Sequence, residues 1–203
     1  MTDIEQIMRL APVIPVLMLD DPEEAVAIGT ALVRGGLPAL EVTLRTPRAL
    51  DVMAAMMSIE GAVVGAGTVL DEAQLDHALD LGARFIVSPG LTDRLARAAL
   101  ARRASFLPGV ANASDIMRGL DLGLSRFKFF PAEANGGLKA LRALAAPFGD
   151  VRFCPTGGIT PESAPEWLAE QAVLCVGGSW VVKPGMSAEQ IEAAARAASA
   201  MRA

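Results

Sequence analysis

The lysine at position 128 is the residue whose type and setting best suit covalent chemistry. It lies in an aromatic, strand-like segment, Arg126–Pro131, of a chain with three lysines and fifteen arginines. Alternate side chains of a strand share a face, so Lys128 and Phe130 point one way and Phe127 and Phe129 the other. Removing an amine from water favours its neutral form, which is the nucleophile that attacks a ketone. On this segment alone, a lysine that reaches solvent from a strand end is an equal alternative.

A carboxylate is embedded in another apolar segment, Ala39–Leu44. If this segment is a strand, Glu41 faces the same interior as Lys128 and could relay protons there. The alternative is a structural Glu41–Lys128 ion pair, which would be weak evidence for stability. Arg45 shares the parity of Glu41 and could hold a substrate carboxylate with its planar guanidinium group, although a solvated loop arginine is the competing interpretation.

Two glycine pairs follow later apolar segments and are typical of phosphate binding through backbone N–H groups. They are Gly157–Gly158 and Gly177–Gly178, the second followed by Ser179. Glycine lets the backbone approach an anion closely, and two pairs at neighbouring strand ends favour a phosphate over simple turns. A further segment, Gly65–Thr68, predicts a tight loop that presents Thr68, and it lacks the spacing of a dinucleotide-binding motif.

Composition limits the remaining classes of function. The chain has 203 residues, 52% hydrophobic content, a formal net charge of -5 and no long Lys/Arg run, so we expect no nucleic-acid or anionic-membrane partner. No apolar stretch reaches the ~18 residues of a membrane span, and the acidic N-terminus is unlike a signal peptide, which predicts a cytoplasmic protein. His77 is the single histidine, and we expect Cys154 and Cys175 to be buried reduced thiols, so neither a metal centre nor a disulfide is expected.

The elements that must position these residues follow a repeated strand–helix pattern, with a unit about every 20 to 25 residues. The predicted strands are Val13–Met18, Ala39–Leu44, Ala62–Gly65, Arg84–Val87, Ser105–Pro108, Arg126–Phe130, Val151–Pro155 and Val173–Val176. Residues typical of helix N-termini predict helix starts near Asp21, Thr46, Asp71, Thr92, Asn112 and Thr160. An extra helix, Thr2–Leu10, precedes the first strand, and Thr2 and Glu5 have capping-box spacing.

Eight such units predict one α/β domain over residues 1–203, a (β/α)8 TIM barrel with an extra N-terminal helix. An open doubly wound sheet is the alternative. Barrel enzymes place their chemistry at the carboxyl ends of the strands, which brings Lys128, Glu41 and both glycine pairs to one rim. Three strand-opening arginines are expected at the opposite, structural end, and they are Arg84, Arg126 and Arg152.

Seven segments together resemble the class I aldolases that act on 2-keto-3-deoxy-6-phosphogluconate (KDPG), with the related 4-hydroxy-2-oxoglutarate (KHG) activity. The resemblance covers essentially the whole chain, in the segments Leu40–Thr46, Val64–Leu70, Val87–Gly90, Leu107–Val110, Arg126–Glu133, Phe153–Ile159 and Val176–Trp180. It implies reversible cleavage of KDPG to pyruvate and glyceraldehyde 3-phosphate, and cleavage of KHG to pyruvate and glyoxylate. It further implies that the protein is a homotrimer and that it binds a small phosphorylated 2-keto acid. The implied reaction needs no cofactor.

The resemblance also implies a role for individual residues. Lys128 is then the Schiff-base lysine and Glu41 the proton relay. The implied substrate-binding residues are Arg45 and Thr68 at the pyruvyl group, Pro89 and Phe130 as pocket walls, Thr156 at the C4 hydroxyl, and Gly157, Gly158 and Ser179 at the phosphate, beside Gly178 of the second glycine pair. Two other interpretations stay open: a phosphosugar isomerase or epimerase, which would not need Lys128, and a non-catalytic phosphosugar-binding barrel.

Overall fold

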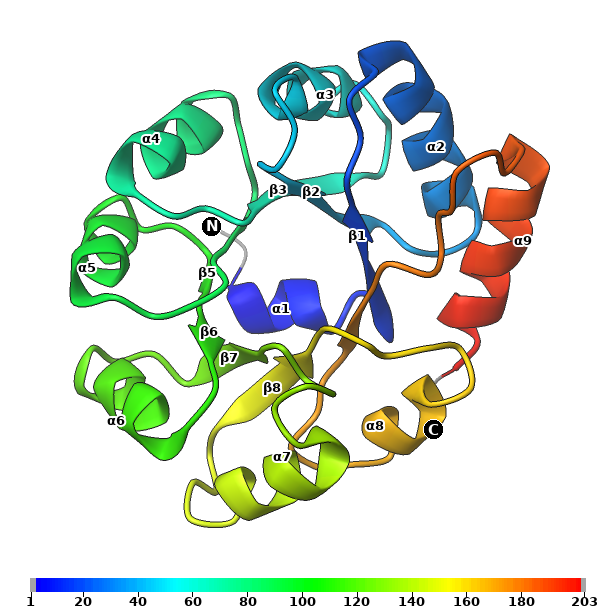
Figure 1. Ribbon diagram of the computed structural model, residues 1–203. Helices are drawn as coiled ribbons and strands as arrows, with labels where there is room; N and C mark the ends of the chain where they lie inside the picture. Colours follow the sequence, from blue (N-terminus) through cyan, green and yellow to red (C-terminus); the bar gives the residue numbers. More distant parts are fainter. Residues whose placement is uncertain (1–2, 202–203) are drawn as a thin grey trace.

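The computed structural model describes residues 3–201 as parallel strands surrounded by helices (Figure 1). The strands are β1 (Val13–Leu17), β2 (Ala39–Thr43), β3 (Val63–Gly67), β4 (Ile86–Val87), β5 (Phe106–Leu107), β6 (Gly109–Val110), β7 (Arg126–Phe129), β8 (Arg152–Pro155) and β9 (Val176–Gly178). The helices are α1 (Ile4–Met8), α2 (Pro22–Arg34), α3 (Ala49–Met56), α4 (Glu72–Asp80), α5 (Asp93–Ala101), α6 (Ala113–Asp121), α7 (Gly137–Ala145), α8 (Ala164–Leu168) and α9 (Ala188–Ser199). The predicted α/β class is confirmed.

The strands pair in parallel and in a nearly sequential order. One ladder has the order β5-β4-β3-β2-β1-β9, and the other has the order β6-β7-β8. Pro108 alone separates β5 from β6 in the chain, and isolated parallel bridges join Phe153 to Val173 and Thr156 to Gly177. A doubly wound sheet reverses its strand order at a switch point, whereas here the first strand lies between the second and the last.

Four of the six helix starts that the capping residues predict are confirmed. The N-caps of α2, α4, α5 and α6 accept a backbone hydrogen bond with their side chains, and these caps are Asp21, Asp71, Thr92 and Asn112. Two predicted starts are displaced. The Thr46 hydroxyl donates to the carbonyl of Leu19 at 2.7 Å instead of capping, and α3 begins at Ala49. Likewise α8 begins at Ala164, after Ser163 rather than Thr160.

Helix α1 lies near the centre of the molecule, on the side of the strands away from the other helices (Figure 1). Ile7 and Met8 are fully buried, and they belong to an inner core cluster with Ile14, Ala39, Phe85, Val87, Leu107, Cys154 and Cys175. The helix is shorter than the predicted Thr2–Leu10, and the predicted cap Thr2 lies outside the described residues. The apolar residues of α1 therefore complete a core that the strands alone would leave open.

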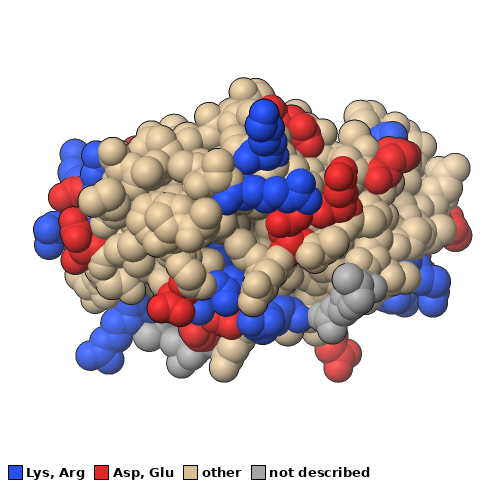
Figure 2. Space-filling view, turned by 90° about the horizontal axis from the view of Figure 1, so that it is seen from below, with Lys and Arg blue, Asp and Glu red and all other residues tan. Residues whose placement is uncertain are grey.

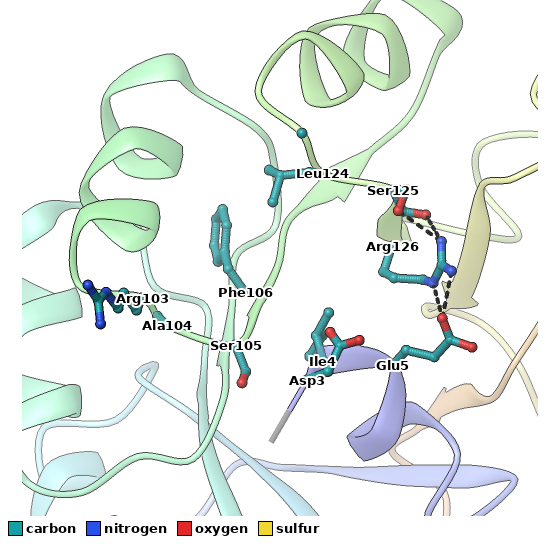
Figure 3. A pocket seen from close by; sticks show the side chains of 11 residues that line it. Asp3, Ile4, Glu5, Arg103, Ala104, Ser105, Phe106, Leu124, Ser125 and Arg126 are labelled. Carbon is teal, nitrogen blue, oxygen red and sulfur yellow. Dashed lines mark hydrogen bonds and ion pairs between the residues drawn. The ribbon is translucent and has the colours of Figure 1, made fainter. Parts of the chain in front are cut away.

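The amino ends of the strands carry a polar pocket of about 280 Å³ next to α1 (Figure 3). Within it, Glu5 of α1 forms an ion pair with Arg126 at the start of β7, with 2.6 Å between Oε2 and the guanidinium. Arg126 also donates to the backbone carbonyls of Ser125 and Asp150, each at 2.9 Å. Arg126 therefore joins α1 to the structural end of the strands, as its position in the sequence predicted.

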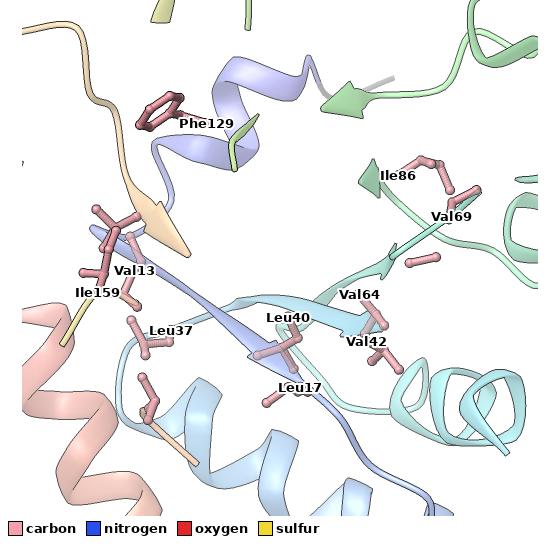
Figure 4. Packing of buried hydrophobic residues seen from close by; sticks show 14 of the residues in the cluster. Val13, Leu17, Leu37, Leu40, Val42, Val64, Val69, Ile86, Phe129 and Ile159 are labelled. Atoms are coloured by element: carbon pink, nitrogen blue, oxygen red, sulfur yellow. The ribbon is translucent and has the colours of Figure 1, made fainter. Parts of the chain in front are cut away.

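The larger core lies between the strands and the surrounding helices, and Figure 4 shows part of it. Phe127 and Phe129 are fully buried there. Their ring centroids lie 6.5 Å from Phe153 and 6.4 Å from Trp167 of α8, respectively. The two aromatic neighbours of Lys128 thus pack toward the helices, which leaves the lysine on the inner face.

The sequence predicts that two glycine segments follow their strands, and this prediction is wrong. Gly65 and Gly67 belong to β3, so the predicted tight loop before Thr68 is a strand, and β9 begins at Val176, where the predicted strand ended. Glycine inside a strand often marks a close approach. A Cβ on Gly65 would lie 2.5 Å from the Phe85 ring, which explains why glycine occurs here without ending the strand.

The surface carries both signs of charge. Figure 2 shows Lys and Arg side chains interspersed with Asp and Glu on the face that it displays. Within residues 3–201, no helix combines the length and the apolar composition needed to cross a membrane.

Candidate active site

Lys128 and Glu41 meet on the inner face of the strands, which faces away from the surrounding helices. The Lys128 Nζ lies 2.9 Å from the Glu41 Oε1, and the two side chains are 7% and 4% exposed. They come from β7 and β2, 87 residues apart in the sequence. Lys128 pairs with Gly109 on one side and Cys154 on the other, so its neighbours in the ladder are a residue without a side chain and a small thiol. The pair is therefore buried and in direct contact, with Lys128 one residue before the end of β7 and Glu41 in the middle of β2.

Gly67 makes room for the Glu41 carboxylate. A Cβ on this glycine would lie 2.3 Å from Glu41 Oε1 and 2.6 Å from Cγ. On the other side of the pair, the Lys128 Nζ lies 5.5 Å from the centroid of the Phe130 ring, a distance suited to a cation–π contact. Phe130 is half-buried, so its ring borders the pair at the open side.

The residues expected at a pyruvyl group lie just beyond β2 and β3. Arg45 is exposed, and within residues 3–201 its guanidinium makes no ion pair or hydrogen bond. Thr68 is half-buried and has φ 58°, a left-handed conformation that is rare for a residue with a branched side chain. Strain of this kind collects at functional sites, because the surrounding structure must hold it in place. The fold brings both residues to the rim that carries Lys128.

Pro89 follows β4 and is half-buried at the same rim. Its carbonyl touches the backbone of β6, since a Cβ on Gly109 would lie 2.0 Å from that oxygen. The preceding residue, Ser88, is buried and donates its hydroxyl to the Gly90 carbonyl at 2.6 Å. The Ser88–Gly90 turn is therefore held from two sides, which fixes the position of the proline.

Thr156 lies directly after β8 and is 6% exposed. Its Oγ1 lies 3.4 Å from the carbonyl oxygen of Cys154, a weak contact that leaves the hydroxyl free for a stronger partner. A Cβ on Gly177 would lie 2.2 Å from this hydroxyl. Gly177 thus provides the space for Thr156, as Gly67 does for Glu41.

The two glycine pairs differ in structure. Gly157 and Gly158 form a true turn after β8, with φ 107° and 82°, whereas Gly178 is buried within β9. Ser179 follows it, is exposed, and within residues 3–201 has no hydrogen-bond partner for its hydroxyl. Ser179 also borders a pocket of about 390 Å³ between the end of β1 and the segment that leads to α9.

Both cysteines are buried free thiols, as expected. Cys175 is fully buried beside Cys154, and the hydrogen bond to Cys154, together with burial, raises the pKa of the Cys175 thiol well above its usual value. A thiol in this state is a poor nucleophile. Cys175 is therefore a poor candidate for covalent chemistry on the inner face.

Sequence reasoning missed the roles of Gly67 and Gly177 as partners of buried polar side chains. It also missed Glu133, which contacts the Gly157–Gly158 turn through its backbone and its side chain. A glycine within a strand, rather than at its end, is the signal that could have identified the first two.

The site and the fold define a class of protein: parallel α/β proteins with a buried lysine–carboxylate pair where the strands end. The family model KDPG and KHG aldolase matches residues 4–197. The KHG/KDPG aldolase of Escherichia coli (strain K12) is 50% identical over 182 residues, which are 89% of this chain and 85% of that protein. The chain belongs to the KDPG and KHG aldolase family.

Two solved structures match closely. The 2-keto-3-deoxy-6-phosphogluconate aldolase of Zymomonas mobilis ZM4, crystallised with 3-phosphoglycerate, has a TM-score of 0.97 and 58% identity, and the match covers 100% of this chain and 98% of that one. The KDPG aldolase of Legionella pneumophila, with pyruvate captured at low pH as a covalent carbinolamine, has a TM-score of 0.94 and 39% identity, over 98% of this chain and 99% of that one.

Proposed function

We propose that this chain is a class I aldolase, a lyase that cleaves KDPG reversibly to pyruvate and glyceraldehyde 3-phosphate. It also cleaves KHG to pyruvate and glyoxylate. The observation that carries the proposal is the buried 2.9 Å contact between Lys128 and Glu41, because a Schiff-base enzyme needs an amine and a proton relay in direct reach. The family and the carbinolamine trapped in the Legionella relative support the same chemistry.

The first half of the reaction forms the covalent intermediate. Glu41 takes a proton from Lys128, and the neutral amine adds to the C2 ketone of the substrate. The resulting carbinolamine loses its hydroxyl group as water when Glu41 returns a proton, which leaves an iminium ion. The iminium is the electron sink for the next step, so this route uses neither a metal ion nor an organic cofactor.

The second half breaks the carbon–carbon bond. Glu41 accepts the proton of the C4 hydroxyl, the C3–C4 electron pair moves toward the iminium, and glyceraldehyde 3-phosphate leaves. The enamine that stays on Lys128 is protonated at C3, and water then hydrolyses the iminium to release pyruvate and the free amine. Each step returns Glu41 or Lys128 to a state that the next step requires.

The substrate-binding roles rest on the family resemblance, and the positions of the residues near the strand ends support them. Arg45 and Thr68 hold the pyruvyl carboxylate, and the exposed guanidinium of Arg45 is free to form a bidentate contact. Pro89 and Phe130 are the walls of the pocket. Thr156 binds the C4 hydroxyl, and the Gly157–Gly158 turn with Gly178 and Ser179 binds the phosphate through backbone N–H groups and one hydroxyl.

The proposal extends to the architecture. The eight strand positions, with β5 and β6 counted as one, form a closed (β/α)8 barrel in a single domain over residues 1–203. The bridge between Thr156 and Gly177 supports closure, because it links the two ladders. We also infer a cytoplasmic homotrimer, on the family resemblance. Light scattering should then give a native mass three times that of the chain.

Steady-state assays test the function directly. The purified protein should release pyruvate from both KDPG and KHG, measured by coupling to lactate dehydrogenase, while Lys128→Ala should be inactive although its circular-dichroism spectrum shows that it folds. An isomerase or a phosphosugar-binding protein would release no pyruvate from either substrate. An active Lys128→Ala variant would also contradict the proposal.

A further inference from the structure

Glu133 contacts several segments that surround the Gly157–Gly158 turn, although it is an exposed residue. Its backbone N–H donates to the Gly157 carbonyl at 3.0 Å. Its Oε1 accepts a hydrogen bond from the indole Nε1 of Trp167 in α8 at 3.2 Å. The other carboxylate oxygen, Oε2, lies at the first residue of α7, 3.2 Å from where a Cβ on Gly137 would stand. One side chain therefore links the turn to two helices.

The Gly158 backbone rests directly on this side chain. A Cβ on Gly158 would lie 2.7 Å from Glu133 Cβ and 2.8 Å from Cγ, so no atom fits between them. Trp167 is a firm support for the carboxylate, since it is 2% exposed and its ring packs near Phe129. Any displacement of Glu133 would therefore be passed on to the turn.

The neighbouring residue strengthens the same connection. The N–H of Ala132 donates to the Thr156 carbonyl at 2.8 Å, immediately before the glycine turn. The backbone hydrogen bonds of Ala132 and Glu133 thus hold the residues Thr156 and Gly157 in place. The hydrogen bond from Trp167 in turn holds the side chain of Glu133. The carboxylate has the same sign of charge as a phosphate, so Glu133 can serve a phosphate only through the geometry of the turn.

We propose that Glu133 is a positioning residue: through its bond to Trp167 it holds the Gly157–Gly158 turn in the shape that binds a phosphate. This inference depends on the proposed function, because it is the proposed function that places the substrate phosphate at this turn. It adds a residue that touches neither the phosphate nor the reacting carbons. Small displacements of binding groups are costly, so the effect should fall on phosphorylated ligands and spare the others.

Glu133→Leu removes the acceptor of the indole N–H, and Trp167→Phe removes the donor while keeping an aromatic ring. Each should raise the KM for KDPG about tenfold relative to the KM for KHG, since a hydrogen bond to a charged group is lost. The Kd of glycerol 3-phosphate, measured by calorimetry, should rise by the same factor. The double variant should do no more than either single one, because both break one bond.

Two variants serve as controls. Glu133→Gln keeps an oxygen that accepts from Trp167, so it should stay within about twofold of the wild type on both substrates. Glu166→Leu makes the same change at an exposed carboxylate of α8, next to Trp167, and should behave as wild type. A merely structural role for Glu133 would lower the melting temperature and affect both substrates alike.

The inference is wrong if Glu133→Leu weakens both substrates equally or neither, or if Glu133→Gln is as damaged as Glu133→Leu. The glycerol 3-phosphate measurement needs no turnover. If the wild type failed to cleave KDPG, the proposed function would fall, while the binding of this probe would still decide the role of Glu133.

Discussion

At the scale of single residues, the contact between Lys128 and Glu41 can act as an ion pair and as a path for a proton. Because the pair is buried, the loss of either charge would leave its partner uncompensated, which is strongly destabilising. The inner core cluster and the half-buried ring of Phe130 both border the pair. An experiment on Glu41 can separate the two uses.

Glu41→Gln keeps the volume of the side chain and an oxygen near Lys128, but it removes the group that accepts a proton. We expect turnover of KDPG to fall by about 10²–10⁴-fold, the range typical of a lost general acid–base. The measurement is kcat, with the melting temperature by circular dichroism as the control. Turnover near that of the wild type, together with a sharply lower melting temperature, would instead support a purely structural ion pair.

Thr156 is the residue proposed to distinguish the two configurations at C4. Its hydroxyl is buried and only weakly engaged, at 3.4 Å from the Cys154 carbonyl, so a substrate hydroxyl can compete for it. Thr156→Val keeps the shape and removes this bond, which should reduce the preference for KDPG over its galactonate epimer by about ten- to a hundredfold. The measurement is kcat/KM on both epimers. An unchanged ratio would refute the role of Thr156.

At the scale of elements, the turn after β8 combines two constraints. Gly158 has φ 82°, and its backbone lies against Glu133, so a side chain there is strained and also displaces its neighbour. Gly158→Ala should raise the KM for KDPG much more than the KM for KHG. Gly149→Ala is the matched control, because a Cβ there would meet no atom within 4 Å. Equal losses on both substrates would mean that the change only damages the fold.

Helix α1 is held at the amino ends of the strands by a carboxylate whose ionisation depends on its partners. Hydrogen bonds from Arg126 and Arg9 hold the pKa of Glu5 below its usual value of 4.5, against the opposing effect of burial. A lowered folded-state pKa contributes stability above the usual value, and this stability is lost as the pH falls through the folded-state pKa.

The wild type should therefore melt above Glu5→Gln at neutral pH, and the difference should shrink once the pH falls below about 4.5. Thermal melts from pH 7 to pH 3 measure it. Glu60→Gln is the control, because Glu60 is exposed and makes no ion pair within residues 3–201. A difference that persists or grows in acid would show that Glu5 acts through packing rather than through its charge.

At the scale of the whole molecule, the parallel arrangement and the meeting of Lys128 with Glu41 could be predicted from the sequence. Strand alternation sets which face each residue occupies, and the rule on strand ends sets the rim. Strand boundaries at glycines could not be predicted, because Gly65 and Gly67 in β3 accommodate the side chains of Phe85 and Glu41, which are distant in the sequence. The split between β5 and β6 follows from Pro108, which has no N–H to donate to the ladder.

Other features depend on contacts that only the folded chain shows. The sequence does not predict the start of helix α7, because its N-cap is Gly136 in a left-handed conformation and no side chain caps it. The contact of Glu133 with Trp167 joins residues 34 apart on two different units. Neither periodicity nor capping chemistry encodes such a pairing.

We infer that Lys128 forms the covalent bond to the substrate. Incubation with pyruvate and sodium borohydride, followed by peptide mass spectrometry, tests it most directly, because reduction makes the Schiff base permanent. We expect one pyruvate-derived adduct per chain, on Lys128, and none on Lys128→Ala. An adduct on Lys139 or Lys183, or an active enzyme that forms no adduct at all, would contradict it.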